Sequence, residues 1–310
     1  MTHKYNEHKL FMEAKFELDQ THQMPDFIIK APTEFYVEAV VTNIKNAGRK
    51  ENERTLEDQM SMAIPPYLQY DFYEFLDEAI IRSASAIKCK HEKFKNEYVN
   101  RDWVNSANPF IIAMSSYSQV NYGREYIYPM LALLYVMYFD ADSENFFKKD
   151  KVLKKETKAE IPLGIFLNNE YEDVSAIIYS CTITLGKLTS LSISMGNPSL
   201  NVVYNIRRNC ATNKYLLQVV NQSSPEDLAD GVFIFHNPNA KNKLPENLFD
   251  GIAVTQFYYD HDQLCYKGNE TPIISRINTS KILALGFKYI IVENLRKYNR
   301  IGIKDFYDIE

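Results

Sequence analysis

The chain has 310 residues, of which 45% are hydrophobic and 24% are charged, and this mixture excludes a disordered protein. Its formal net charge of −5 excludes an overall basic field, so a nucleic-acid partner would need a local basic patch. The four cysteines match no zinc spacing or disulfide framework. The most apolar stretch, residues 128–139, is shorter than the ~20 residues that cross a bilayer, so we expect a cytoplasmic protein without a membrane partner.

Three short strands are predicted in the first forty or so residues. Residues 9–18 alternate apolar and polar side chains, which is the period of a half-buried strand. The segment "DFIIK" follows directly after Pro25, and the turn "APTE" separates it from "FYVEAVVT". Strands joined by such a short turn are typical of an antiparallel meander. The polar residues 43–57 that follow are predicted to be a loop.

A long helix is predicted over roughly residues 70–96. Its apolar residues recur at three-, four- and seven-residue spacings and form one stripe: Ile80, Ala84, Ile87 and Phe94. Residues 108–116 are a short apolar run that follows a proline, which is typical of a buried central strand. An aromatic-rich helix is expected at about residues 124–139. The lysine-rich residues 148–158 are predicted to be a solvated linker or helix surface.

The second half of the chain is richer in strands. Six apolar runs are candidates: "VSAIIYSCTI", "SLNVVYNI", "YLLQVV", "GVFIFHNP", "IAVTQFYY" and "YIIVENL". No Pro/Gly/Ser-rich linker divides the chain. We therefore predict an α/β protein with a mixed central sheet flanked by helices. Residues 1–150 would form its core, and the β-rich residues 151–310 would form a continuation or a second domain.

Asp26 in "PDFII" and Glu38 in "FYVEAVV" are the candidate functional acids. Because their strands are neighbours in the predicted hairpin, the two side chains can share one face at about 5 Å from each other. Two carboxylates at this distance suit Mg²⁺ or Mn²⁺, which proteins hold through carboxylates, water and phosphate oxygens. Such an ion can activate water for phosphodiester hydrolysis, and a nearby lysine can stabilise the developing charge.

These residues resemble the motif of the PD-(D/E)xK nuclease superfamily, which has a restriction-endonuclease-like fold. The matching elements are Pro25-Asp26, a short hairpin, and Glu38 within an apolar strand. The pattern departs at Val40, because members of the superfamily usually place a lysine two residues after the acid. The resemblance therefore implies the acid pair directly, while the lysine must come from another part of the chain.

Some members of the superfamily carry the lysine on the following helix, and this chain offers "AIKCKHEKF" there. Lys90 and Lys93 are the best candidates, and Arg82 comes next. Lys90 lies three residues after Ile87 and four before Phe94, so it borders the apolar stripe. The strand "PFIIAM" after this helix also suits the fold, since it would pair beside the hairpin that carries the acids.

The resemblance implies a Mg²⁺- or Mn²⁺-dependent endonuclease that acts on DNA in bacterial defence, restriction or DNA processing. Asp26 and Glu38 would bind the metal, and Lys90 or Lys93 would be the catalytic cation. The segments "VSAIIYS" and "GVFIFHNPNAKNKLP" resemble those of uncharacterised bacterial proteins with this core, and they imply the fold only. Because Val40 replaces the usual lysine, the alternative is an inactive binding or assembly module, as a homo-oligomer or as a partner in a larger system.

Each candidate residue also has a purely structural interpretation. Asp26 follows a proline at the start of a strand, where aspartate is a common turn residue. Glu38 is simply solvated if its strand lies at a sheet edge with one wet face. Lys90 and Lys93 suit the wet side of a helix. Acids on opposite faces of the sheet would indicate a different α/β fold without a link to nucleases.

Other polar clusters are predicted to be structural. Asp260, His261 and Asp262 would form a polar turn between two strands, because adjacent strand residues face opposite ways. His236 precedes Asn-Pro and is expected to cap or pack a turn. Residues 287–300 interleave aromatic and basic side chains. This pattern can bind single-stranded nucleic acid, but it is more typical of a core element with solvated cations.

Overall fold

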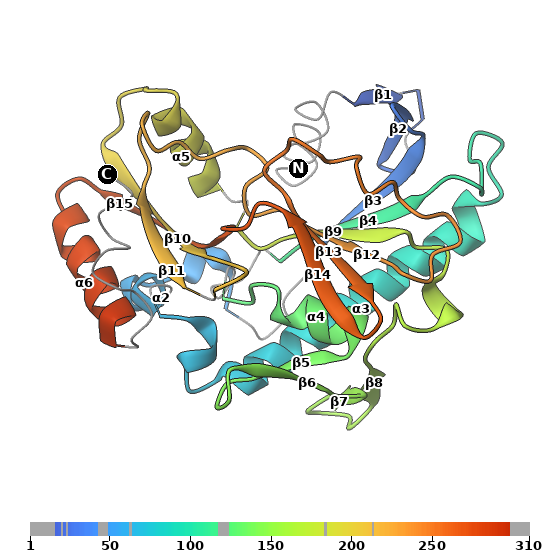
Figure 1. Cartoon of the computed structure of the whole chain (residues 1–310), viewed down its shortest axis with the longest axis horizontal. Coiled ribbons are helices and arrows are strands. Elements are labelled where there is room, and N and C mark those ends of the chain that lie inside the picture. The colour runs from blue at the N-terminus through green and yellow to red at the C-terminus, as the bar shows by residue number, and fades with distance from the viewer. Residues whose placement is uncertain are drawn as a thin grey trace.

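The computed structural model describes residues 16–19, 21–22, 24–42, 49–61, 64–116, 124–182, 185–212 and 214–297. These residues form a mixed α/β fold in which a large sheet lies beside a smaller one (Figure 1). The α-helices are α2 (Leu56–Ser61), α3 (Phe72–Lys93), α4 (Tyr128–Tyr135), α5 (Leu185–Ser194) and α6 (Ala284–Lys297). Single helical turns are η1 (Glu51–Glu53), η2 (Pro66–Leu68), η3 (Phe94–Tyr98) and η4 (Asn169–Tyr171).

The central sheet has eight strands in the order β1-β2-β3-β4-β9-β12-β13-β14. They are β1 (Glu17–Asp19), β2 (Phe27–Ala31), β3 (Phe35–Val41), β4 (Phe110–Ser115), β9 (Ala176–Ser180), β12 (Phe233–His236), β13 (Thr255–Asp260) and β14 (Gln263–Gly268). β1, β2 and β3 form the predicted antiparallel meander. β4 and β9 add parallel to β3, and β12 follows antiparallel to β9. The expected strand "PFIIAM" therefore pairs beside the hairpin that carries the acids.

Three smaller sheets surround this one. β10 (Asn201–Arg208) lies between β11 (Tyr215–Val219) and β15 (Ile273–Ser280) in an antiparallel sheet that packs against α5 and α6. β5 (Met137–Asp140) pairs with β6 (Asn145–Lys148), and β7 (Lys151–Leu153) pairs with β8 (Glu160–Pro162). These two ribbons lie below the large sheet in Figure 1. The eight-stranded sheet takes four strands from each side of residue 150.

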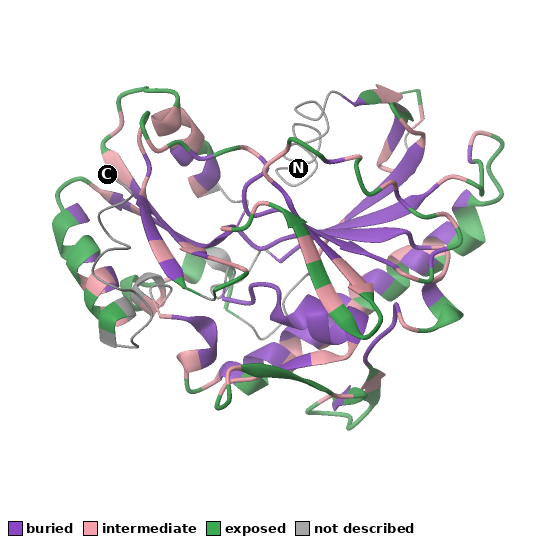
Figure 2. Cartoon of the chain, viewed as in Figure 1, coloured by how far each residue is buried: buried purple, intermediate pink, exposed green. Residues whose placement is uncertain are grey.

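The two faces of the central sheet are covered differently. One face, which includes Tyr36 and Ile112, packs against α3 and α4 in the larger apolar core. The other face, which includes Val37 and Ile111, packs against residues 244–254 in a smaller core. Figure 2 shows β4, β9, β12 and α4 almost wholly buried. Alternate residues of β3 therefore face two apolar layers, and a charged side chain on β3 needs hydrogen-bond or ion-pair partners.

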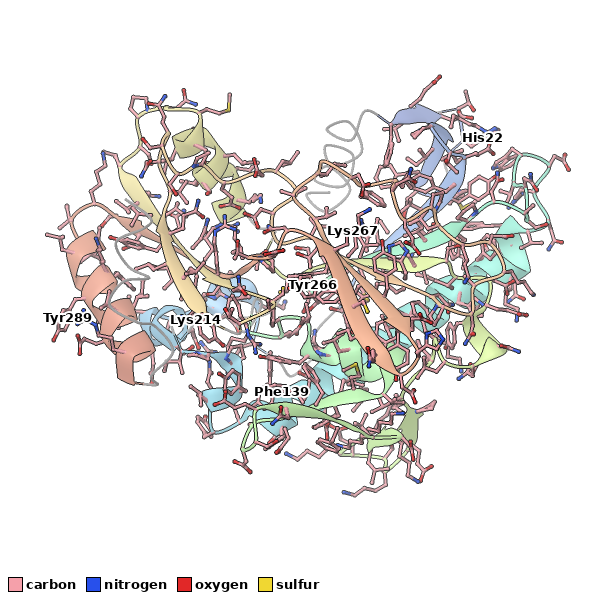
Figure 3. The ribbon with its side chains drawn as sticks, viewed as in Figure 1. His22, Phe139, Lys214, Tyr266, Lys267 and Tyr289 are labelled. Atoms are coloured by element: carbon pink, nitrogen blue, oxygen red, sulfur yellow. The ribbon has the colours of Figure 1, made fainter. Side chains whose placement is uncertain are left out.

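Several predicted elements differ in the structure. The segment "YIIVENL" lies in α6 and is not a strand: its helix buries Phe287 and Ile291, four residues apart, while Tyr289 points outward and is 67% exposed (Figure 3). The residues 148–158 are not a linker, because β7 pairs with β8. The helix predicted at residues 124–139 is shorter, since Val136 adopts a φ of 58° and the chain turns into β5.

Two predictions fall partly on residues that are not described. Residues 9–15 of the first predicted strand and residues 43–48 of the predicted loop lie outside the described part of the chain. Within that part, β1 begins at Glu17, and the loop gives way to η1 and α2. No helix among the described residues is long and apolar enough to cross a membrane.

Candidate active site

Glu38 is a buried carboxylate within the central sheet. It lies on β3, between β2 and β4, and is only 1% exposed, so its interpretation as a solvated residue on an edge strand is wrong. A buried carboxylate needs partners to stay ionised. Lys90 Nζ and Lys93 Nζ donate to Oε1 of Glu38 at 2.7 and 2.9 Å, and the Tyr98 hydroxyl donates to Oε2 at 2.7 Å.

The two lysines come from α3, which packs on this face of the sheet. Ile87 and Phe94 are buried against the core, as the apolar stripe predicts. Lys90 and Lys93 lie at the rim of the stripe, and their side chains are 19% and 29% exposed. Lysine at such a position can bury its apolar stem while the ammonium group reaches a polar partner. Both lysines are therefore paired with the predicted acid and are not simply solvated.

Asp26 lies in a bend directly before β2, the strand beside β3, at the turn-like position that its structural interpretation expects. The pairing of β2 with β3 ends with Phe27 and Val37, and Asp26 is the residue before this last pair. The Asp26 carboxylate accepts a hydrogen bond from the backbone amide of Ala39 at 2.8 Å. This bond ties Asp26 to β3 one residue beyond Glu38. The Asp26 carboxylate is thus held beside the backbone of the residue that follows Glu38.

Tyr98 is a member of the site that the sequence interpretation missed. It is fully buried at the end of η3, the π-helical turn that continues α3. Its ring also lies 4.9 Å from the Lys93 ammonium group. One signal was present, because Tyr98 follows Phe94 by four residues and so extends the apolar stripe. That spacing predicts a buried ring, but not the carboxylate that its hydroxyl meets.

The electrostatics of the cluster keep Glu38 ionised. Burial alone would raise the pKa of Glu38, but the hydrogen bonds from Lys90, Lys93 and Tyr98 outweigh burial and hold this pKa below its ordinary value. Burial and the Glu38 carboxylate together raise the pKa of Tyr98. Tyr98 therefore keeps its proton and acts as a donor to an ionised acid.

Val40 and Arg82 do not supply a cation to this site. Val40 is partly buried and packs on the apolar core, so the position usual for the lysine is filled by an aliphatic side chain. Arg82 is buried on the earlier part of α3 and pairs with Glu125. Glu125 also accepts a hydrogen bond from the Tyr179 hydroxyl at 3.1 Å. Of the three cationic candidates, Lys90 and Lys93 reach Glu38, and Arg82 belongs to a separate ion pair.

The other polar clusters lie where structural roles were expected. Asp260, His261 and Asp262 lie at the turn between β13 and β14, and their side chains are largely exposed. His236 is buried, and its ring stacks on Tyr258 with centroids 4.3 Å apart. The predictions of a polar turn and of a packing histidine are confirmed.

A divalent cation at this site would have two candidate carboxylate ligands, Asp26 and Glu38. Among the described residues, no group of three or more His, Cys, Asp or Glu side chains could hold a metal ion. Mg²⁺ and Mn²⁺ can nevertheless be held by one or two carboxylates when water and substrate oxygens complete the shell. A carboxylate has about four lone-pair positions, and three donors reach Glu38, so acceptor capacity remains on Oε2. Asp26 and Glu38 are the residues that would hold the ion.

Comparisons with known proteins assign no family to the chain. A scan against protein-family models, a search of curated proteins and a search of solved structures each found no match.

Proposed function

We propose that the protein is a Mg²⁺- or Mn²⁺-dependent endonuclease that hydrolyses phosphodiester bonds in DNA. The observation that supports this most is the meeting of an acid pair with two lysines from one helix. The Asp26 carboxylate accepts from the amide of Ala39, next to Glu38, and Lys90 and Lys93 are both within 3 Å of a Glu38 oxygen. Hard oxygen donors beside positive groups are the combination that phosphoryl transfer uses.

The order of the elements around the site also supports the proposal. β1, β2, β3, α3 and β4 follow one another along the chain, apart from short helices before α3. β4 pairs in parallel with β3, and α3 packs on the face that carries Glu38. This order is the one that the resemblance to the PD-(D/E)xK nucleases implies, with the lysines on the helix and not at Val40.

The chemistry assigns a task to each residue. Hydrolysis joins a water oxygen to phosphorus, breaks the bond to the leaving oxygen, and delivers a proton to that oxygen. A divalent ion at Asp26 and Glu38 would supply Lewis acidity and would lower the pKa of bound water. Lys90 and Lys93 can donate hydrogen bonds to the negative charge that develops on the phosphate oxygens. Burial of Glu38 keeps bulk water from screening these charges.

The proposal is tested by nicking of supercoiled plasmid DNA in the presence of Mg²⁺ or Mn²⁺. We expect wild-type protein to nick the plasmid, and Asp26→Ala and Glu38→Ala to lower the rate about 100-fold or more. Lys88→Ala is the matched control, because Lys88 lies on the same helix with 65% of its side chain exposed and should leave the rate unchanged. Circular dichroism of each variant checks that it is folded.

Two results would contradict the proposal. Equal nicking by wild type, Asp26→Ala and Glu38→Ala would show that the activity does not come from this site. Absence of nicking by the wild type with either metal would favour the alternative, in which the chain keeps the fold as a binding or assembly module.

A further inference from the structure

We propose that Tyr98 is the positioning residue of this site, because its hydroxyl holds Oε2 of the Glu38 carboxylate while Oε1 faces the two lysines. The inference rests on the proposed function and deepens it. It assigns a role to a residue outside the acid-and-lysine set. It also explains how a carboxylate with several partners keeps a single orientation.

The contacts of Tyr98 leave its hydroxyl little freedom. The residue is fully buried, and its ring belongs to the apolar core that α3 shares with the central sheet. The Lys93 ammonium group lies over the ring, while the hydroxyl donates to Oε2 of Glu38 at 2.7 Å. A ring fixed on all sides places its hydroxyl at one point. Tyr98 therefore anchors one oxygen of the carboxylate, while the partly exposed lysines share the other.

A widened helical turn brings Tyr98 to this point. The amide of Val99 donates to the carbonyl of Phe94, five residues earlier, at 3.1 Å, which is the bond of a π turn. In a continuous α-helix, Tyr98 would lie above Phe94, and the neighbour of Lys93 would be Glu97. The extra residue in the turn moves Tyr98 toward Lys93 and leaves Glu97 exposed. Turns of this kind within helices are frequent at functional sites.

The remaining acceptor capacity of Glu38 lies on the oxygen that Tyr98 holds. Two ammonium groups already donate to Oε1, whereas Oε2 receives one hydrogen bond. Tyr98 thus holds the carboxylate oxygen that receives no hydrogen bond from the two lysines. Without the hydroxyl, the carboxylate would be free to rotate, and either of its oxygens could face the two lysines.

The decisive measurement is Mn²⁺ binding to the full chain without DNA. The loss of the electron paramagnetic resonance signal of free Mn²⁺ reports this binding. Residues that orient a metal-binding side chain typically contribute about 10- to 100-fold to metal affinity or activity. We expect Tyr98→Phe to weaken Mn²⁺ binding by that factor and to lower kcat for plasmid nicking, with KM for DNA unchanged. Tyr138→Phe is the control, because it removes another tyrosine hydroxyl that donates to a carboxylate, that of Asp77, at 2.7 Å.

The possible outcomes separate this inference from the proposed function. If wild type binds Mn²⁺ and nicks DNA but folded Tyr98→Phe matches it in Mn²⁺ affinity and kcat, the role of Tyr98 is overturned and the nuclease proposal stands. If wild type neither binds Mn²⁺ nor nicks DNA, the proposed function itself is overturned. Deletion of Asn96, which returns the turn to α-helical width, should cause the same loss with the tyrosine present. A folded deletion variant with wild-type Mn²⁺ affinity would also overturn the role of Tyr98.

Discussion

At the scale of single residues, Glu38 is an ionised group where an apolar side chain would serve stability better. Moving a carboxylate out of water costs on the order of several kcal/mol, and paired cations often only offset that cost. Replacing such buried ion clusters with apolar residues of similar volume is often neutral or stabilising. The cluster around Glu38 is therefore poorly explained as a device for stability, and buried charges with shifted pKa values gather at functional sites.

The two lysines should act as redundant partners of Glu38. In Lys90→Ala or Lys93→Ala, one ammonium group still faces the carboxylate, so each should lower the free energy of unfolding by only about 1 kcal/mol. The double variant leaves a buried carboxylate with the Tyr98 hydroxyl alone, and we expect a loss of about 3–5 kcal/mol. Urea unfolding measures these changes. A double variant that loses no more than the sum of the single losses would contradict the shared role.

At the scale of structural elements, the turn after β12 fastens the segments that precede β4 and β9. The Asn237 side chain donates to the carbonyls of Tyr171 and Val174 at 3.0 and 2.8 Å, and its own amide donates to Ser175. Asn242 donates to the carbonyl of Ser106 at 2.7 Å, in the segment that joins η3 to β4. The segment "HNPNAKN" therefore binds the loop before β9 and the end of the α3–β4 connection. We assign this segment the role of positioning those two loops.

Asn237→Ala should destabilise the fold noticeably. Asn237 is 3% exposed, and its loss leaves two carbonyls without their side-chain donor, so we expect the free energy of unfolding to fall by about 2–4 kcal/mol. Asn100→Ala is the control, because Asn100 is exposed and makes one hydrogen bond, to the Asn96 carbonyl at 3.2 Å. Its effect should stay within about 0.5 kcal/mol in the same thermal or urea unfolding experiment. Equal losses in the two variants would refute the fastening role.

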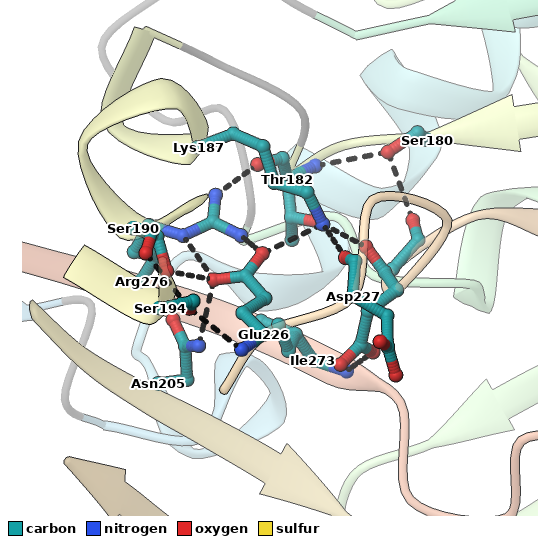
Figure 4. A network of polar contacts seen from close by, with 12 residues as sticks. Ser180, Thr182, Lys187, Ser190, Ser194, Asn205, Glu226, Asp227, Ile273 and Arg276 are labelled. Carbon is teal, nitrogen blue, oxygen red and sulfur yellow. Dashed lines mark hydrogen bonds and ion pairs between the residues drawn. The ribbon is translucent and has the colours of Figure 1, made fainter. Parts of the chain in front are cut away.

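At the scale of the whole molecule, a buried ionic network joins the three-stranded sheet to α5 and to the end of β9 in the central sheet (Figure 4). Glu226 is the centre: it pairs with Lys187 of α5 at 2.7 Å and with Arg276 of β15, and Asn205 of β10 donates to it at 2.8 Å. Arg276 also donates to the carbonyl of Thr182, two residues beyond β9. One carboxylate thus links α5, both long strands of the smaller sheet and the end of a central strand.

This network predicts a specific loss of stability in acid. Burial alone would raise the pKa of Glu226, but the charges of Arg276 and Lys187 outweigh burial and lower that pKa from 4.5 to about 2. A carboxyl group with a lowered pKa contributes stability that is complete above its unfolded pKa and is lost as the pH falls toward the folded value. For Glu226 this window runs from 4.5 down to about 2.

Glu226→Gln should lower the free energy of unfolding at neutral pH by about 3–5 kcal/mol, because it leaves two buried cations without their carboxylate. The difference from wild type should narrow as the pH falls through the window, since the wild-type residue becomes protonated there. Urea unfolding at several pH values measures this difference. Glu160→Gln, which removes an exposed carboxylate paired with Lys151, is the control and should show little change at any pH. A constant difference between Glu226→Gln and wild type across the window would contradict the role of Glu226.

The sequence by itself determined the elements that carry the acids and the lysines. Two apolar segments joined by a short turn predicted β2 and β3, and a stripe of apolar residues predicted α3, because both signals lie in consecutive residues. The short turn between β2 and β3 also determined that these strands pair, and Asp26 directly precedes the strand beside that of Glu38. Local pattern is weaker where a short apolar run suits either a helix or a strand, as the segment "YIIVENL" within α6 does.

Only the tertiary structure decided which groups meet Glu38. The rotation and docking of α3 bring Lys90 and Lys93 to its carboxylate, whereas Arg82 on the same helix pairs with Glu125. The π turn adds Tyr98, which is 60 residues from Glu38 in the sequence. Periodicity shows which face of a helix is buried, but contacts between distant residues depend on how whole elements pack together. The acids could therefore be named from the sequence, while their partners required the fold.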